Sequence, residues 1–94
     1  LSGVSVENIT PEWAQKLKLA PSTRGVVVAD VDPDSNAAAA GLRPNFVIES
    51  VAKQPVANVN EFNAAMQKAD KKEVLLRVRR PDGRSSFLVV KSEE

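Results

Sequence analysis

The sequence predicts a single α+β domain in which a small, mostly antiparallel and partly closed sheet carries short helices. Strand-like and helix-like segments alternate along the chain in the order β-α-β-α-β-α-β-β. The helix-like segments are mostly too short to be the crossovers of a parallel sheet, and a hairpin signal joins the last two strands. Because 94 residues have room for only one core, we expect residues 1–94 to form one domain.

The first half of the chain is expected to form two strands and two short helices in alternation. These elements are placed at residues 2–9 (strand), 11–18 (helix), 25–31 (strand) and 35–40 (helix). Residues 2–9 alternate loosely between apolar and polar side chains, whereas residues 25–31 form a β-branched run typical of a buried strand. Thr10 and Pro11 are typical of an N-cap and of a first helical position. Gly41 ends the second helix.

The second half is expected to form a strand, the clearest helix of the chain and a closing hairpin. These elements are placed at residues 46–51, 59–69, and 74–79 with 86–90. Asn58 is a suitable N-cap for the helix, whose apolar residues recur at the helical period. Those residues are Val59, Phe62, Ala65, Met66 and Ala69. Pro81-Asp82-Gly83 lies between the last two strands and predicts a tight turn.

The chain contains no histidine and no cysteine, which removes most catalytic chemistry. It can form no Ser-His-Asp triad, and it offers no thiol nucleophile and no imidazole or thiolate metal site. The remaining catalytic options are a carboxylate pair, a Ser-Lys dyad or a carboxylate-bound metal ion. We therefore expect this chain to have no catalytic residues of its own and to need no cofactor.

The charged residues give no indication of binding to nucleic acid, membrane or metal. Thirteen basic and twelve acidic residues give a net charge of +1, and no apolar run approaches the length of a membrane span. Four arginines surround the last hairpin, Arg77, Arg79, Arg80 and Arg84. No aromatic residues interleave them for base stacking, so we interpret them as a solvated face, with a docking surface for a neighbouring protease domain as the alternative. Asp30, Asp32 and Asp34 have calcium-loop spacing, but Pro33 interrupts them and the glycine and distal glutamate are absent.

Three segments of the chain resemble parts of a PDZ domain. Residues 23–28, Thr-Arg-Gly-Val-Val-Val, resemble the carboxylate-binding loop and the strand that follows it. Residues 34–44 resemble the small-helix motif of the family, and residues 58–69 lie where the helix beside the peptide groove belongs. With the strand and helix before them, the element order resembles the permuted bacterial PDZ domains of HtrA/Deg serine proteases over essentially the whole chain. The hairpin position is most similar to the second, C-terminal PDZ domain of the DegQ/MucD type.

This resemblance implies a partly open antiparallel barrel or sandwich of five to six strands with two or three short helices. It also implies a non-catalytic peptide-binding module of a periplasmic, trypsin-like quality-control protease. Such a module binds C-termini or extended segments of misfolded proteins by adding them as a strand to a sheet edge. Its other partners would be the upstream protease domain and the sister PDZ domains of the parent. The alternative is an assembly domain whose groove is unused or occluded and which holds protease oligomers together.

Carried over by position, the resemblance places a carboxylate-binding loop, a groove strand and a helix wall. The residues are Arg24, Gly25 and Val26 for the loop, Val27, Val28 and Ala29 for the rest of the strand, and Val59, Asn63 and Met66 for the helix. Gly25 would permit a tight loop with converging N–H groups, and residues 26–29 would offer an unpaired edge.

Each of these residues also has a structural interpretation. Val26 and Val28 alternate on one strand face and would equally suit a core, and helical apolar stripes such as the one containing Met66 are often core. Gly25 would also suit an ordinary loop, and Arg24 would also suit a solvated position.

The resemblance has one departure, directly after Pro44. The family usually places Gly-Asp there, whereas this chain has Asn45-Phe46. Asn45 tolerates positive φ better than most residues and is a plausible substitute. For Phe46 we favour core packing over an added surface contact.

Overall fold

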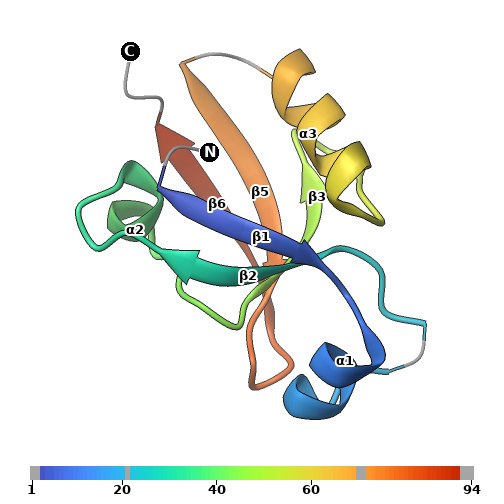
Figure 1. Cartoon of the computed structure of the whole chain (residues 1–94). Coiled ribbons are helices and arrows are strands. Elements are labelled where there is room, and N and C mark those ends of the chain that lie inside the picture. Colours follow the sequence, from blue (N-terminus) through green and yellow to red (C-terminus); the bar gives the residue numbers. More distant parts are fainter. Residues whose placement is uncertain (1–2, 21, 70–71, 92–94) are drawn as a thin grey trace.

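The computed structural model describes residues 3–20, 22–69 and 72–91 (Figure 1). The elements are β1 (Val4–Asn8), α1 (Pro11–Leu17), β2 (Val26–Val31), α2 (Asn36–Ala40), β3 (Val47–Val51), β4 (Gln54–Pro55), α3 (Val59–Lys68), β5 (Glu73–Arg79) and β6 (Ser85–Lys91). The order and type of the expected elements are confirmed, and the short β4 follows the turn after β3. None of the helices in the described part of the chain is long and apolar enough to cross a bilayer.

All strand pairs are antiparallel, and the sheet stays open. The strand order is β1-β2-β3-β5-β6, with the short β4 paired to β3. The long edge strands of the sheet are therefore β1 and β6 (Figure 1). Helix α2 packs against β6, and α3 contacts β1 and β3. The expected α+β class is confirmed as an open sheet with three short helices.

Residue types that favour helix caps occupy both helix starts that the sequence predicts most clearly. The backbone N–H of Trp13 donates to the Thr10 side chain at 3.2 Å, with Pro11 in the first turn. The Asn58 side chain accepts from the N–H of Glu61 at 2.8 Å, and the Glu61 side chain accepts in return from the N–H of Ala57. This reciprocal pair resembles a capping box and fixes where α3 begins.

The core lies between the inner face of the sheet and the helices α2 and α3. Its largest fully buried side chains are Leu42, Ile48, Leu76, Val26, Val27, Val28, Val47, Val51 and Val78. Phe46 is also buried, at 8% exposure, so the packing interpretation of this residue is confirmed. Asn45 has a φ of +74°, a conformation that asparagine tolerates better than most residues.

Candidate functional site

Strand β2 lies inside the sheet, so the predicted groove strand has no open edge. Val26 pairs with Asn8 of β1 and with Ile48 of β3, and Val27 is paired in the same way on both sides. Val28 donates its N–H to the carbonyl of Phe46 and accepts from the N–H of Asn45, both at 2.8 Å.

The prediction that residues 26–29 form the open edge is therefore wrong. The physical reason is that β1 covers this side of β2 along its length. The side chains of Val26 and Val28 are fully buried, as their core interpretation requires, and Val27 is fully buried as well. Ala29 is skipped in the pairing of β1 with β2, where the register shifts.

Gly25 serves close packing between strands. It has a φ of +142°, and a β carbon there would overlap the backbone carbonyl oxygen of Ile48. Glycine is therefore required where β2 first approaches β3. Arg24, next to it, is exposed and has no hydrogen-bond or ion-pair partner among the described residues. The predicted carboxylate-binding loop is thus a site of close packing between β2 and β3. The exposed guanidinium of Arg24 lies beside it.

The structure has an open edge on β1 instead. The N–H and C=O of Val28 bond toward β3, so Val28 and its partner Val6 on β1 form a non-hydrogen-bonded pair. The N–H and C=O of Val6 therefore point away from β2. The carbonyl of Gly3 accepts the N–H of Asp32, so by alternation the next residue, Val4, also points its backbone outward. Both side chains are partly buried and pack against the core. β1 therefore presents outward-facing N–H and C=O groups next to apolar side chains.

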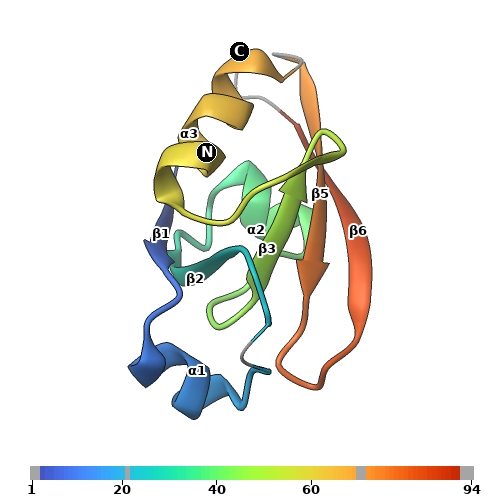
Figure 2. The same ribbon diagram turned by 90° about the vertical axis from the view of Figure 1, so that its right-hand side faces the viewer.

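Helix α3 lies beside this edge. The N–H of Val59, at the start of α3, donates to the side-chain oxygen of Asn8, at the end of β1, at 2.7 Å. From there α3 runs back toward the start of β1 (Figure 2). Val59 and Met66 are partly buried against the same core as Val4 and Val6, whereas Asn63 is exposed. The predicted helix wall thus flanks β1 rather than β2.

Sequence reasoning missed Val4 and Val6, although a signal for them was present. A strand that is buried on both faces has a continuous apolar run, and residues 26–29 form one. A half-exposed strand alternates, as residues 4–7 do, with Ser5 and Glu7 exposed. The pattern thus distinguished the interior strand from the edge strand.

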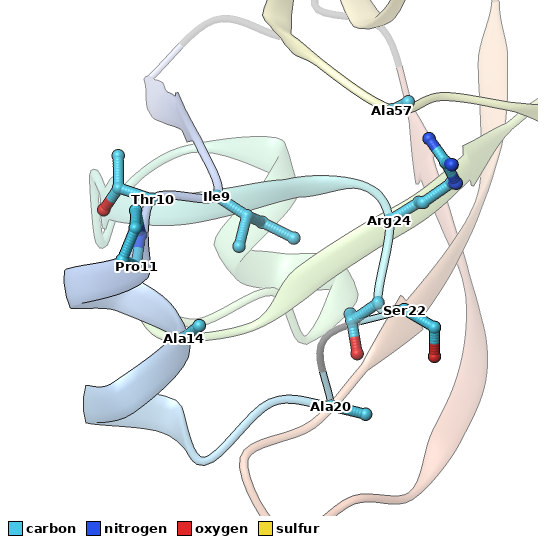
Figure 3. Close-up of a pocket in the computed structure, with 9 residues that line it drawn as sticks. Ile9, Thr10, Pro11, Ala14, Ala20, Ser22, Arg24 and Ala57 are labelled. Atoms are coloured by element: carbon cyan, nitrogen blue, oxygen red, sulfur yellow. The ribbon is translucent and has the colours of Figure 1, made fainter.

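A separate pocket of about 450 Å³ lies at the other end of β1 (Figure 3). It is formed by the β1–α1 junction, the segment that leads into β2 and the residue Ala57. Its lining includes the apolar Ile9, Pro11 and Ala14, and Arg24 is the charged residue of the lining. Arg24 therefore lies by the end of β1, near Asn8, and far along the strand from Val4.

The described residues contain no arrangement typical of catalysis or metal binding. Within the described ranges no three carboxylates gather as a metal site, and the Asp32 side chain accepts the N–H of Asp34 at 2.9 Å in a local turn. The chain has one Ser-x-x-Lys spacing, Ser50 with Lys53, which sequence reasoning overlooked. It runs from β3 into a turn, so the helical geometry that brings such a pair together in enzymes is absent here.

Comparison with known proteins agrees with this architecture. The family model described as "PDZ domain" matches residues 27–80. A protein of Chlamydia trachomatis named probable periplasmic serine endoprotease DegP-like is 45% identical over 98% of this chain and 18% of its own length. The protein of that name in Chlamydia pneumoniae is 36% identical over 98% of this chain and 19% of its own length. The chain thus spans about a fifth of these relatives.

Solved structures show the same fold. The HtrA-type protease AlgW, solved with a decapeptide, superposes with a TM-score of 0.79 at 33% identity and covers 97% of this chain and 28% of its own. The HtrA3 PDZ domain, solved with a phage-derived ligand, superposes with a TM-score of 0.77 at 23% identity over 97% of this chain and 82% of its own. Since the family model matches more than half of its residues, the chain belongs to the PDZ domain family, and it matches the PDZ regions of DegP-like and HtrA-type proteases.

Proposed function

We propose that this domain binds C-terminal or extended peptides by adding them as a strand to β1, beside α3. The observation that carries the proposal is the open edge of β1, where Val4 and Val6 direct backbone groups away from β2. A peptide can pair with such groups whatever its sequence, and neighbouring side chains then supply specificity. The solved AlgW structures with peptides support a peptide ligand.

The geometry also gives the ligand a direction. An antiparallel ligand, the more stable pairing, would have its last residue at the start of β1, near Val4. That residue would meet Val4, Val6 and the partly buried Met66, so we expect an apolar C-terminal residue. Gly3, with a φ of +79°, directly precedes this point, and we place the ligand carboxylate next to it. Arg24, by the other end of β1, would then face upstream ligand residues.

We further propose that the domain is a non-catalytic regulatory part of a periplasmic serine protease of the quality-control type. Its ligands would be exposed segments of misfolded proteins, and its neighbours would be the upstream protease domain and a sister PDZ domain. The names and lengths of the Chlamydia relatives support this placement. We also propose that it is the second, C-terminal PDZ domain of its parent.

A peptide titration followed by amide NMR tests the binding proposal. A pentapeptide ending in valine, with a free carboxylate, should shift the amides of Val4, Val6 and Met66. We expect a dissociation constant from about one to a few hundred micromolar, because few side chains are engaged and peptide ordering opposes binding. The amidated peptide is the matched control and should bind clearly more weakly. Equal binding of both peptides, or none, would favour the assembly role with an unused groove.

A further inference from the structure

The opposite edge of the sheet, β6, carries an exposed apolar stripe. Phe87 and Val89 are the large hydrophobic residues with high exposure in the described part of the chain, at 63% and 49%. They stand on the same face of β6, and each lies opposite a residue of β5, Arg77 and Leu75 respectively. This face turns away from the core, and neither side chain belongs to the buried core cluster.

The backbone of the same residues is unpaired on its outer side. In the hairpin, the N–H of Arg80 donates to the carbonyl of Arg84, which marks that pair as hydrogen-bonded. By antiparallel alternation the even-numbered residues of β6 bond to β5, and Phe87 and Val89 direct their N–H and C=O groups to the open edge. The carbonyl of Leu75, opposite Val89, accepts the N–H of Ala52, which confirms that this pair does not bond across β5 and β6.

The end of this edge is already occupied. The side-chain amide of Asn36 donates to the carbonyl of Lys91 at 3.0 Å, a bond between residues 55 positions apart. It satisfies the outward carbonyl of the last residue of β6. The edge that stays available therefore extends from Ser85 to Val89, which is long enough to pair with an extended segment of about five residues.

The charge around the stripe is mainly positive. β5, β6 and their hairpin, with the adjoining Glu49 of β3, carry five basic and three acidic side chains: Arg77, Arg79, Arg80, Arg84 and Lys91 against Glu49, Glu73 and Asp82. Glu49 is approached by Arg77 at 3.7 Å and by Arg79 at 3.4 Å, so one carboxylate serves two guanidinium groups. Arg77 remains half-exposed beside Phe87 and can accept a further carboxylate.

We propose that β6 is a second strand-addition site for an extended segment. One face of this segment carries acidic and apolar side chains, and its other face carries small polar side chains. The segment would pair with the outward backbone groups of Phe87 and Val89 and cover their side chains, with its carboxylates next to Arg77 and the hairpin arginines. A second copy of this chain is a poorer occupant, because it would bring the same excess of positive charge to the edge.

A blocked peptide tests this site without offering a terminal carboxylate to β1. The probe is acetyl-Glu-Thr-Val-Thr-Glu-amide, and its matched control is acetyl-Lys-Thr-Val-Thr-Lys-amide. The acidic peptide should shift the amides of Ser85, Phe87 and Val89, with binding that weakens as salt is raised. The lysine peptide should bind about fivefold more weakly than the acidic peptide, a modest difference because the charges are exposed.

Three variants separate the backbone, apolar and charge contributions. Val89→Pro removes an N–H that points to the open edge, which an edge strand tolerates, and should weaken the acidic peptide about tenfold. Val89→Thr retains this N–H and is its matched control. Arg77→Gln removes the positive charge without adding a negative one and should weaken binding of the acidic peptide about fivefold. If Val89→Pro does not fold, Arg77→Gln still tests the site.

Three outcomes would overturn the proposal. Equal binding of the lysine peptide would show that charge does not select the occupant. Shifts confined to β1 and α3 would place the peptide at the other edge. Shifts of the Phe87 and Val89 amides that follow protein concentration, with no peptide present, would identify a second copy as the occupant. Because the two sites lie on opposite edges, failure at β6 leaves binding at β1 untouched.

Discussion

The side-chain oxygen of Asn8 accepts the backbone N–H of Val59 at 2.7 Å and so ties the end of β1 to the start of α3 across 51 residues of sequence. The N–H groups of a first helical turn have no partner within the helix, so this bond satisfies one of them. It also fixes the spacing between the strand and the helix that flank the proposed ligand. The bond lies at the end of the proposed peptide path that is opposite the ligand terminus.

Asn8→Ala tests how much this bond contributes. We expect the free energy of unfolding to fall by about 1 kcal/mol, the usual net value of a hydrogen bond to a helix start. Asn60→Ala is the matched control, because the Asn60 side chain is exposed on α3 and makes no hydrogen bond within the described structure. It should change stability by less than about 0.5 kcal/mol. Equal effects of the two substitutions in urea denaturation would show that the bond does not stabilise the domain.

Gly25→Ala distinguishes close packing from a carboxylate-binding role at the same position. The new β carbon would overlap the Ile48 carbonyl at a positive φ, so β2 and β3 would have to separate. We expect a loss of about 3 kcal/mol or more in thermal or chemical denaturation. Gly83→Ala is the control: its φ is +90° but nothing lies within 4 Å, so only backbone strain of about 1 kcal/mol is expected. A stable Gly25→Ala protein that has lost peptide binding would contradict this account.

Local patterns in the sequence predict the elements of this domain well, because caps, turns and periodicity act within a few residues. Thr10 and Asn58 begin helices as their side-chain chemistry requires, and Gly83 turns the hairpin. The position of β2 depends instead on pairings with distant residues, since Val26 meets both Asn8 and Ile48. A resemblance transferred by position therefore placed the open edge on an interior strand.

The strand that lies beside α3 is also determined by long-range pairing. Helix α3 was predicted correctly as an amphipathic helix, because its apolar period is local, and its Met66 is partly buried, as the proposed wall requires. Its neighbour in the sheet could not be derived from that period. The continuous apolar run of β2 against the alternation of β1 is the sequence signal that would have placed it.

Val6→Pro tests which strand forms the ligand edge. Its N–H points away from β2, so proline removes no bond of the sheet, and edge strands tolerate such a proline. We expect a folded domain whose affinity for the valine-terminated peptide falls about tenfold or more. Val27→Pro is the contrasting variant, because Val27 is paired on both sides, and it should lose about 3 kcal/mol or more and unfold. Undiminished binding by folded Val6→Pro, measured by NMR titration, would exclude β1 as the binding edge.

Met66→Glu tests the helix wall. Met66 is partly buried beside β1, so an ionised carboxylate there stays partly hydrated and the free energy of unfolding should fall by only about 1 kcal/mol. The same carboxylate would lie near the terminus of the ligand and repel it, and binding should weaken at least about tenfold, or about 1.4 kcal/mol. Phe62→Ala is the core control on the same helix: Phe62 is 3% exposed, and its truncation should cost about 3–5 kcal/mol. Chemical denaturation of both variants, with peptide titration of those that stay folded, compares the two costs. If Met66→Glu unfolds as readily as Phe62→Ala, Met66 belongs to the core and the helix wall is misplaced, because only a buried, unpaired charge carries so large a penalty.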